Sequence, residues 1–289
     1  MEKTLGAAAI GIRGLSLPQT LDLALETGFD SIAFDVREAA RLAATGLGED
    51  GVDQLFKRNG VRPGLWAVPV AWRDDDQASE ELQALPGLAA LARNLGCNRA
   101  TSGFRPGSDE RAFDANLAWH VERLKPVAEA LAQEDCMLAL EFIGPATFRA
   151  PSRHEFIYTL EGTMEMIRQI GTGNVGLLLD AWHLYTSGGS MDDIARLKAD
   201  DVVVVHVNDA PSGIPLDEQV DNVRALPLET GVIDLVRFME QLKTIGFDGP
   251  VMPEPFSQRV EELAMKDPRA AARETSRSMD ALWNAAGLG

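Results

Sequence analysis

The stretch Asn174-Val175-Gly176-Leu177-Leu178-Leu179-Asp180-Ala181-Trp182-His183 decides the fold of this chain. An apolar run of strand length ends on a carboxylate, Asp180, and a histidine, His183, follows three residues later. Short continuous apolar runs are typical of parallel strands that are buried on both faces. The stretch therefore predicts a strand of a parallel sheet that delivers Asp180 to the edge of the sheet where the strand ends.

Three other segments repeat this pattern. The apolar runs 137–140, 202–205 and 250–253 end on Glu141, His206 and Glu254, respectively. Carboxylate oxygens and imidazole nitrogens suit a divalent cation such as Mn²⁺, Mg²⁺, Co²⁺ or Zn²⁺. Carboxylates that converge on one rim repel each other unless a cation or a proton lies between them. The four strand ends together therefore predict a metal site, although each one alone is more typical of a loop residue or a helix cap.

Strand-like and helix-like segments alternate along the whole chain. The expected strands are 5–12, 31–36, 64–70, 97–102, 137–141, 174–180, 202–206 and 250–254. The expected helices are 17–27, 37–58 with an interruption at 46–48, 80–95, 114–133, 161–170, 191–199, 234–245 and 260–286. Eight such pairs without a break in composition predict an α/β fold, a closed (β/α)₈ TIM barrel, as one domain over residues 1–289. An open doubly wound sheet would show a glycine-rich turn after its first strand. Residues 11–14 contain too little of that glycine pattern to predict such a turn.

The composition excludes several classes of function. The net charge of −17, from 44 acidic and 27 basic residues, repels phosphate backbones and anionic membranes, so we expect no nucleic-acid or membrane partner. No apolar run approaches about 18 residues, and the N-terminal segment lacks the layout of a signal peptide. Cys97 and Cys136 are too few for a disulfide framework. We expect a cytoplasmic protein, and a homo-oligomer is compatible with the sequence although no segment identifies an interface.

The predicted site resembles that of the sugar isomerase/epimerase superfamily. This xylose-isomerase-like TIM barrel group contains ketose 3-epimerases, hydroxypyruvate isomerase, and the inosose isomerase and dehydratase enzymes. The resemblance rests on Leu140-Glu141, Gly176-Leu177-Leu178-Leu179-Asp180 with His183, Val205-His206-Val207-Asn208-Asp209, and Gly246-Phe247-Asp248-Gly249 leading to Glu254. It is strongest from about residue 137 to residue 256 and only architectural before that.

The resemblance implies roles for individual residues. One divalent metal ion, usually Mn²⁺ in the family, is assigned to Glu141, Asp180, His206 and Glu254. Two of these ligands, Glu141 and Glu254, would also act as acid and base. His183 and Arg224 would contact substrate oxygens, although a surface location for Arg224 is the alternative.

Two tryptophans near strand ends are candidates for a sugar pocket. Trp182 and Trp66 could form its walls, because apolar faces of sugars pack on aromatic rings. Core packing is the alternative interpretation for both residues.

The expected activity is isomerisation or epimerisation of a small sugar or cyclitol. A cation chelated by a substrate carbonyl and its neighbouring hydroxyl acidifies the C–H between them and stabilises the enediolate that forms. The sequence shows no phosphate-cradling loop and no basic cluster, so we expect an unphosphorylated ketose or keto-cyclitol. Residues 143–148 lack the additional glutamate that ketose 3-epimerases carry, which weakens that particular assignment.

The sequence bears on three other functions. A dehydratase of the inosose type, a lyase, would begin with the same proton abstraction and then expel a β-hydroxyl group, so it stays open. A barrel that binds a sugar or a metal without turnover also stays open. A DNA-repair endonuclease of the endonuclease IV type needs more than the four histidines of this chain, and the negative charge also excludes it.

Overall fold

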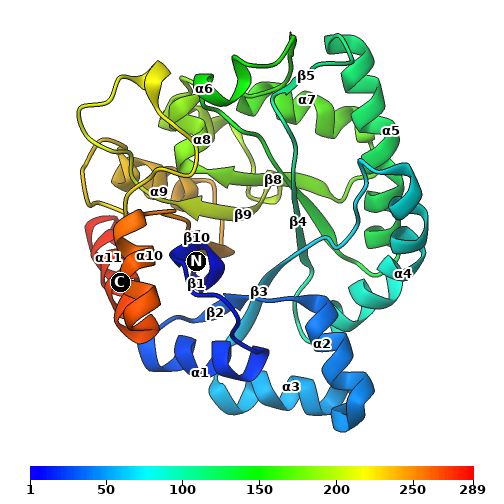
Figure 1. Cartoon of the computed structure of the whole chain (residues 1–289), viewed down its shortest axis with the longest axis vertical. Coiled ribbons are helices and arrows are strands. Elements are labelled where there is room, and N and C mark those ends of the chain that lie inside the picture. The colour runs from blue at the N-terminus through cyan, green and yellow to red at the C-terminus, as the bar shows by residue number, and fades with distance from the viewer.

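The computed structural model describes all residues from Met1 to Gly289, and its parallel strands close into a barrel surrounded by helices (Figure 1). The order of strands around the barrel is β1-β10-β9-β8-β6-β4-β3-β2. Their bounds are β1 (Glu2–Leu5), β2 (Ser31–Ala33), β3 (Arg62–Ala67), β4 (Arg99–Gly103), β6 (Met137–Glu141), β8 (Val175–Asp180), β9 (Val202–Val207) and β10 (Pro250–Pro253). The predicted (β/α)₈ barrel is confirmed. A small antiparallel sheet of β5 (Gly107–Ser108) and β7 (His154–Glu155) joins two of the loops.

Helices form the outer ring (Figure 1). The longer ones are α1 (Leu17–Thr27), α2 (Val36–Leu42), α3 (Gly48–Asn59), α4 (Asp75–Asn94), α5 (Phe113–Ala132), α7 (Leu160–Ile170), α9 (Leu235–Thr244), α10 (Gln258–Lys266) and α11 (Pro268–Ala285). Short helices are α6 (Ala146–Arg149) and α8 (Ala181–Thr186), and helical turns are η1 (Ala8–Ile10), η2 (Ala43–Leu47), η3 (Met191–Arg196), η4 (Ala199–Asp201) and η5 (Leu216–Glu218). No helix combines the length and the hydrophobicity that a membrane span requires.

Some boundaries differ from the prediction. The first strand was expected at 5–12, but β1 is Glu2–Leu5, because its register is set by pairing with β10 and β2. The alanine-rich segment after it forms η1, which ends at Gly11 in a left-handed conformation (φ 80°). The expected helix at 191–199 is only the short turn η3, and the helix α8 follows β8 directly because Asp180 caps it.

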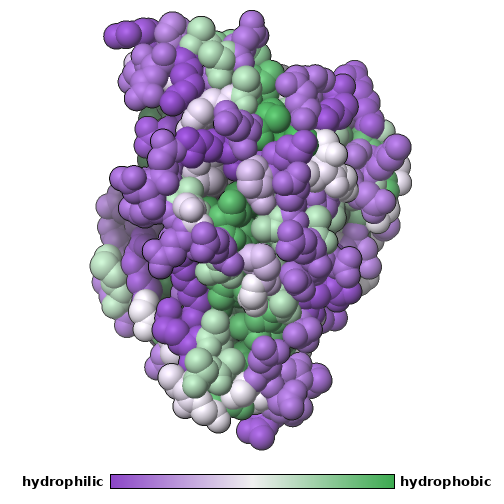
Figure 2. Space-filling view, turned by 90° about the vertical axis from the view of Figure 1, so that its right-hand side faces the viewer, coloured by the Kyte–Doolittle hydropathy of each residue, from purple (hydrophilic) through white to green (hydrophobic).

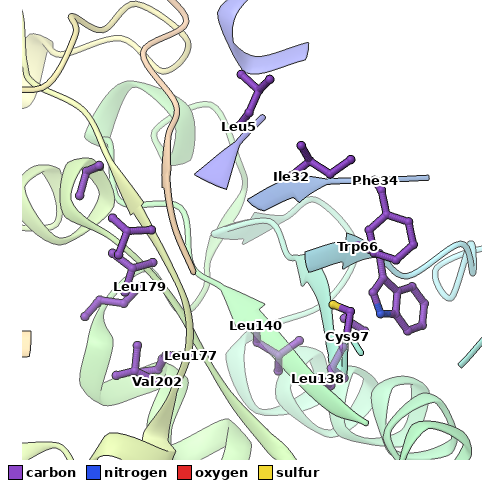
Figure 3. Close-up of a cluster of buried hydrophobic side chains, with 14 of the residues drawn as sticks. Leu5, Ile32, Phe34, Trp66, Cys97, Leu138, Leu140, Leu177, Leu179 and Val202 are labelled. Carbon is purple, nitrogen blue, oxygen red and sulfur yellow. The ribbon is translucent and has the colours of Figure 1, made fainter. Parts of the chain in front are cut away.

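Alternate strand residues face opposite sides of the barrel wall. Outward-facing leucines of β6 and β8 pack in the layer between strands and helices, together with Trp66 of β3 (Figure 3). The interior of the barrel is filled by a separate apolar cluster: Leu65, Ala139, Leu178, Val203, Val204 and Met252. On β6, β8, β9 and β10, the next inward position beyond this cluster is Glu141, Asp180, His206 and Glu254, respectively. The two-residue period of the strands therefore places these four polar residues inside the barrel mouth.

The face of the molecule that carries α4 and α5 is mostly hydrophilic (Figure 2). On the face that carries α4 and α5, a band of hydrophobic residues runs between polar ones (Figure 2). The chain's hydrophobic residues are otherwise concentrated in the large layer between the barrel and its helices.

A buried carboxylate anchors the long loop between β9 and α9. Asp209 accepts hydrogen bonds from four backbone N–H groups, those of Ala210 (2.9 Å), Thr230 (3.0 Å), Gly231 (2.7 Å) and Ile233 (3.0 Å). Asp209 also pairs with Ala225 through two backbone hydrogen bonds. These contacts fix both ends of the loop that carries Arg224.

Replacing this carboxylate should destabilise the protein. Asp209→Ala leaves four N–H groups without their acceptor, and we expect the free energy of unfolding to fall by about 3 kcal/mol. The matched control is Asp234→Ala, which removes an N-cap of α9 that accepts from Arg237, at a cost of about 1 kcal/mol. Urea unfolding followed by circular dichroism measures both, and equal losses in the two variants would contradict the anchoring role.

Candidate metal centre

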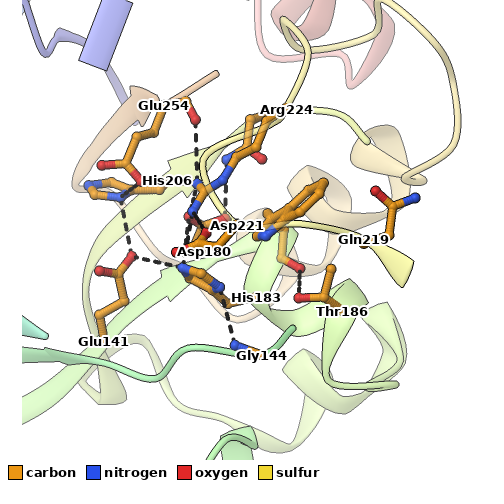
Figure 4. Close-up of polar contacts among 12 residues, drawn as sticks. Glu141, Gly144, Asp180, His183, Thr186, His206, Gln219, Asp221, Arg224 and Glu254 are labelled. Carbon is orange, nitrogen blue, oxygen red and sulfur yellow. Dashed lines mark hydrogen bonds and ion pairs between the residues drawn. The ribbon is translucent and has the colours of Figure 1, made fainter. Parts of the chain in front are cut away.

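The structure brings four ligand-type side chains together at the mouth of the barrel (Figure 4). One ligand atom from each of Glu141, Asp180, His206 and Glu254 lies within 4.8 Å of the others. The strand register explains the convergence, because Asp180 of β8 pairs with His206 of β9. Glu254 follows β10, and its N–H donates to the carbonyl of Val207 at 3.1 Å.

Asp180 is fully buried and satisfied on both oxygens. Oδ1 accepts from the Trp182 N–H (2.7 Å) and from Asn208 Nδ2 (3.2 Å), and Oδ2 accepts from Arg224 Nη1 (2.9 Å). Burial alone would raise the pKa of Asp180, but Arg224 and the two neighbouring histidines lower it to about 2. The side chain is therefore a carboxylate at neutral pH.

His206 lies between the two glutamates without bonding to either. Its Nδ1 is 3.5 Å from Glu141 Oε1 and 3.4 Å from Glu254 Oε2, and neither contact has hydrogen-bond geometry. Both ring nitrogens of His206 and Oε1 of Glu141 are buried without a partner. Burial alone would lower the pKa of His206, but the two glutamates raise it to about 10. These unpartnered atoms mark a position where a cation fits, since buried polar atoms normally have partners.

Arg224 is buried at the centre of the site. Only 5% of it is exposed, so the surface alternative is wrong. Nη1 donates to Asp180 Oδ2 (2.9 Å) and Glu254 Oε2 (3.0 Å), and Nη2 donates to Asp221 Oδ1 (2.9 Å). Burial alone would lower the pKa of Arg224, but the carboxylates around it raise the pKa above its ordinary value. The guanidinium neutralises part of the negative charge that the strand ends accumulate.

His183 lies one turn into α8 and is also buried. Its Nδ1 is 3.2 Å from the N–H of Gly144, and its Nε2 is 3.2 Å from Arg224 Nη2. The same Nε2 lies 3.9 Å from both Glu141 Oε1 and Asp180 Oδ2. The structure therefore places His183 beside the four ligand-type residues.

The two tryptophans lie away from the open cavity. Trp66 faces outward from β3 and is completely buried between the barrel and the helices (Figure 3). Trp182 is also completely buried, and its ring centroid lies 5.4 Å from Cζ of Arg224. Trp66 thus packs in the core, and Trp182 supports Arg224 rather than lining the cavity.

A cavity of about 880 Å³ opens above the site. Glu141, His206 and Glu254 line one part of it, and the segments after β1, β2 and β3 together with residues of β2, β3 and β4 supply most of the remainder. Phe34 and Val68 are among the apolar residues of this opposite wall. The volume is in the usual range for a small-molecule site.

The sequence interpretation missed three residues that shape the site. Asn208 donates to Asp180, and its position two residues after His206 on the same strand face was an available signal. Asp221, which holds Arg224, precedes it by three residues but gave no signal of its own. Phe256 lies 5.0 Å from Cζ of Arg224 and has a left-handed backbone (φ 36°), a strained conformation that no local pattern announces.

Comparisons with known proteins agree on one family. The model of the xylose isomerase-like TIM barrel family matches residues 21–282. An inosose isomerase from Bacillus velezensis is 26% identical over 280 residues, which cover 94% of each chain. A xylose isomerase domain protein from Alicyclobacillus acidocaldarius has a structure with a TM-score of 0.86 at 28% identity, covering 99% of both chains.

A further solved structure shows the same fold. The IOLI protein, crystallised with a bound zinc atom, gives a TM-score of 0.77 at 20% identity, over 99% of this chain and 98% of that one. The family model spans nearly the entire barrel, including all four strand ends of the site. The chain therefore belongs to the xylose isomerase-like TIM barrel family.

Proposed function

We propose that this protein is a divalent-metal-dependent isomerase or epimerase of an unphosphorylated ketose or keto-cyclitol. The observation that carries the proposal is the convergence of two glutamates, an aspartate and a histidine within 4.8 Å, with buried donor atoms that have no partner. Membership of the family and the similarity to an inosose isomerase support the substrate class.

The donor set fits one divalent cation. Glu141, Asp180, His206 and Glu254 would hold it through three carboxylates and one imidazole, a set that suits Mn²⁺ and also Mg²⁺, Co²⁺ or Zn²⁺. Arg224 does not block this role, because a carboxylate oxygen that accepts one hydrogen bond keeps a second lone pair. When bound, the ion supplies Lewis acidity toward a substrate carbonyl.

The arrangement of the two glutamates supports a role in proton transfer. Glu141 and Glu254 approach His206 from different sides (Figure 4). Burial would raise the pKa of Glu254, but His206 and Arg224 lower it, which keeps the carboxylate ionised and able to accept a proton. One carboxylate would remove the proton beside the substrate carbonyl, and the other would return a proton to the opposite face or to the neighbouring carbon.

The charge of the cavity argues against a phosphorylated substrate. Its lining contains four acids, Asp35, Glu38, Glu141 and Glu254, against two arginines, Arg13 and Arg37. Arg37 is already paired with Glu81 at 2.8 Å. A neutral polyol meets less repulsion in such a cavity than a dianionic phosphate ester would.

Metal content tests the ligand set. We expect about one divalent ion per purified chain, and its loss in His206→Ala, because His206 supplies the one imidazole among the four ligand-type residues. The matched control is His154→Ala, which changes a histidine of β7 outside the site and should retain the ion. Metal analysis by inductively coupled plasma mass spectrometry is the measurement. A protein that binds no divalent ion even after Mn²⁺ addition would refute the metal-dependent function.

Deuterium exchange tests the acid/base role. In deuterated water, the native protein should incorporate deuterium beside the carbonyl of its substrate, screened among ketohexoses and inososes. Glu254→Gln should slow exchange at least about 100-fold, since it removes the proton acceptor. Glu262→Gln, on the exposed surface of α10, is the control and should exchange normally.

The same assay separates isomerase from lyase. An isomerase or epimerase yields a deuterated isomer of unchanged composition, whereas the dehydratase alternative yields a product that has lost water. Normal exchange in Glu254→Gln would exclude Glu254 as the base while leaving the metal site to be judged by the metal analysis.

A further inference from the structure

His183 lies between two N–H donors. The Gly144 N–H points at Nδ1 from a distance of 3.2 Å, and Arg224 Nη2 lies 3.2 Å from Nε2 on the other side of the ring. A neutral imidazole has only one bare nitrogen and therefore accepts only one of these bonds. The two contacts therefore compete. The nitrogen of His183 that accepts a hydrogen bond is the bare one, and the other nitrogen carries the proton.

The Gly144 contact has the firmer geometry. Backbone N–H groups have a fixed direction, whereas Arg224 has three carboxylates to bind in addition to His183. Acceptance at Nδ1 leaves the proton on Nε2, which then faces Glu141 Oε1 and Asp180 Oδ2 at 3.9 Å each. The opposite tautomer would point an N–H at the Gly144 N–H, whose direction is fixed, whereas the preferred tautomer requires only that Arg224 Nη2 give up its contact with His183 and keep its bond to Asp221.

Gly144 is held against α8 so closely that no side chain fits there. A Cβ atom at this position would lie 2.3 Å from the His183 carbonyl oxygen and 2.6 Å from Thr186 Oγ1. Only glycine permits this approach, which brings the Gly144 N–H within reach of the ring.

Arg149 clamps Gly144 from the other side. Its Nη1 donates to the Gly144 carbonyl (2.5 Å), and its Nε donates to Glu155 Oε2 of β7 (3.1 Å). The guanidinium also stacks on Tyr158, with Cζ 3.9 Å from the ring centroid. Arg149 therefore ties the segment after β6 to the small β5–β7 sheet, and it touches none of the four ligand-type residues.

We propose that Arg149 is a positioning residue that, through Gly144, holds His183 in the tautomer with its proton on Nε2. That tautomer presents an N–H donor to the reaction site, where it can bind a substrate oxygen. The tautomer assignment stands on geometry alone, and its benefit to catalysis rests on the proposed function.

Nitrogen NMR measures the tautomer directly. The full chain, labelled with ¹⁵N-histidine and saturated with diamagnetic Mg²⁺, contains only four histidines, and His183→Gln identifies the signals of His183. In the native protein we expect a bare Nδ1 and a protonated Nε2. In Arg149→Met we expect a second population with the proton on Nδ1, because the Gly144 peptide loses its clamp. Arg149→Lys keeps the positive charge but has a single donor group, so its population of the Nδ1-protonated tautomer should lie between those of the native protein and Arg149→Met. This intermediate result would distinguish loss of the contact from a folding defect.

Steady-state kinetics give the second readout, measured on the ketose or inosose that undergoes deuterium exchange. We expect kcat/KM of Arg149→Met to fall about tenfold with metal content unchanged, as for other losses of an outer-shell partner. Arg153→Met is the matched control in the same loop, since the Arg153 side chain makes no hydrogen bond or ion pair, and it should leave both readouts unchanged.

The outcomes separate this proposal from the proposed function. A proton on Nδ1 in the native protein would overturn it, as would an unchanged tautomer in Arg149→Met, even if activity falls. If the tautomer shifts in Arg149→Met but the native protein exchanges deuterium into no ketose or inosose, the positioning role is supported and the proposed reaction is refuted.

Discussion

Three carboxylates meet at one end of the barrel and repel one another. The surrounding residues supply the opposite charge and the hydrogen bonds that offset this repulsion. Glu141, Asp180 and Glu254 present oxygens within 4.8 Å of one another and of His206. Buried charges at such distances destabilise a fold unless opposite charge and hydrogen bonds surround them. The buried Arg224 provides one compensating charge, and His206 lies where a proton or a shared cation provides another.

That compensation requires an ordered loop. Arg224 comes from the long segment between β9 and α9, which has little regular structure. Four N–H groups donate to Asp209 and close the segment at its base, and Asp221 orients the guanidinium from within it. A residue two positions after His206, Asn208, orients Asp180 in turn. The motif around β9 therefore serves the site at three points, of which only His206 is a ligand-type residue at the centre.

Both the scaffold and the site follow from the strand period. Outward-facing residues of β6 and β8 build the layer beneath the helices (Figure 3), and inward-facing ones fill the barrel. Beyond the last apolar inward residue, the next inward residue of β6 and β9 and the residue just after β10 line the cavity, whereas Asp180 at the end of β8 is fully buried. Polar side chains at those positions replace no residue of the apolar core, so a barrel can carry reactive groups at its strand ends once their charges are compensated. Gly144 contacts His183, and Arg149 of α6 contacts Gly144, both from the segment after β6 rather than from the barrel.

The sequence alone determined the closed barrel and the convergence of Glu141, Asp180, His206 and Glu254. Apolar runs of strand length, each ending on a polar residue, are a local pattern, and parallel strands bring equivalent ends to one rim. The bounds of β1 could not be predicted from a local pattern, because they are set by pairing with β10 and β2, which are distant in the sequence. The outward direction of Trp66, the burial of Arg224 and the contact of Gly144 with His183 were decided only by the tertiary structure. Each depends on atoms from segments distant in sequence, so no periodicity or spacing within one segment carries that information.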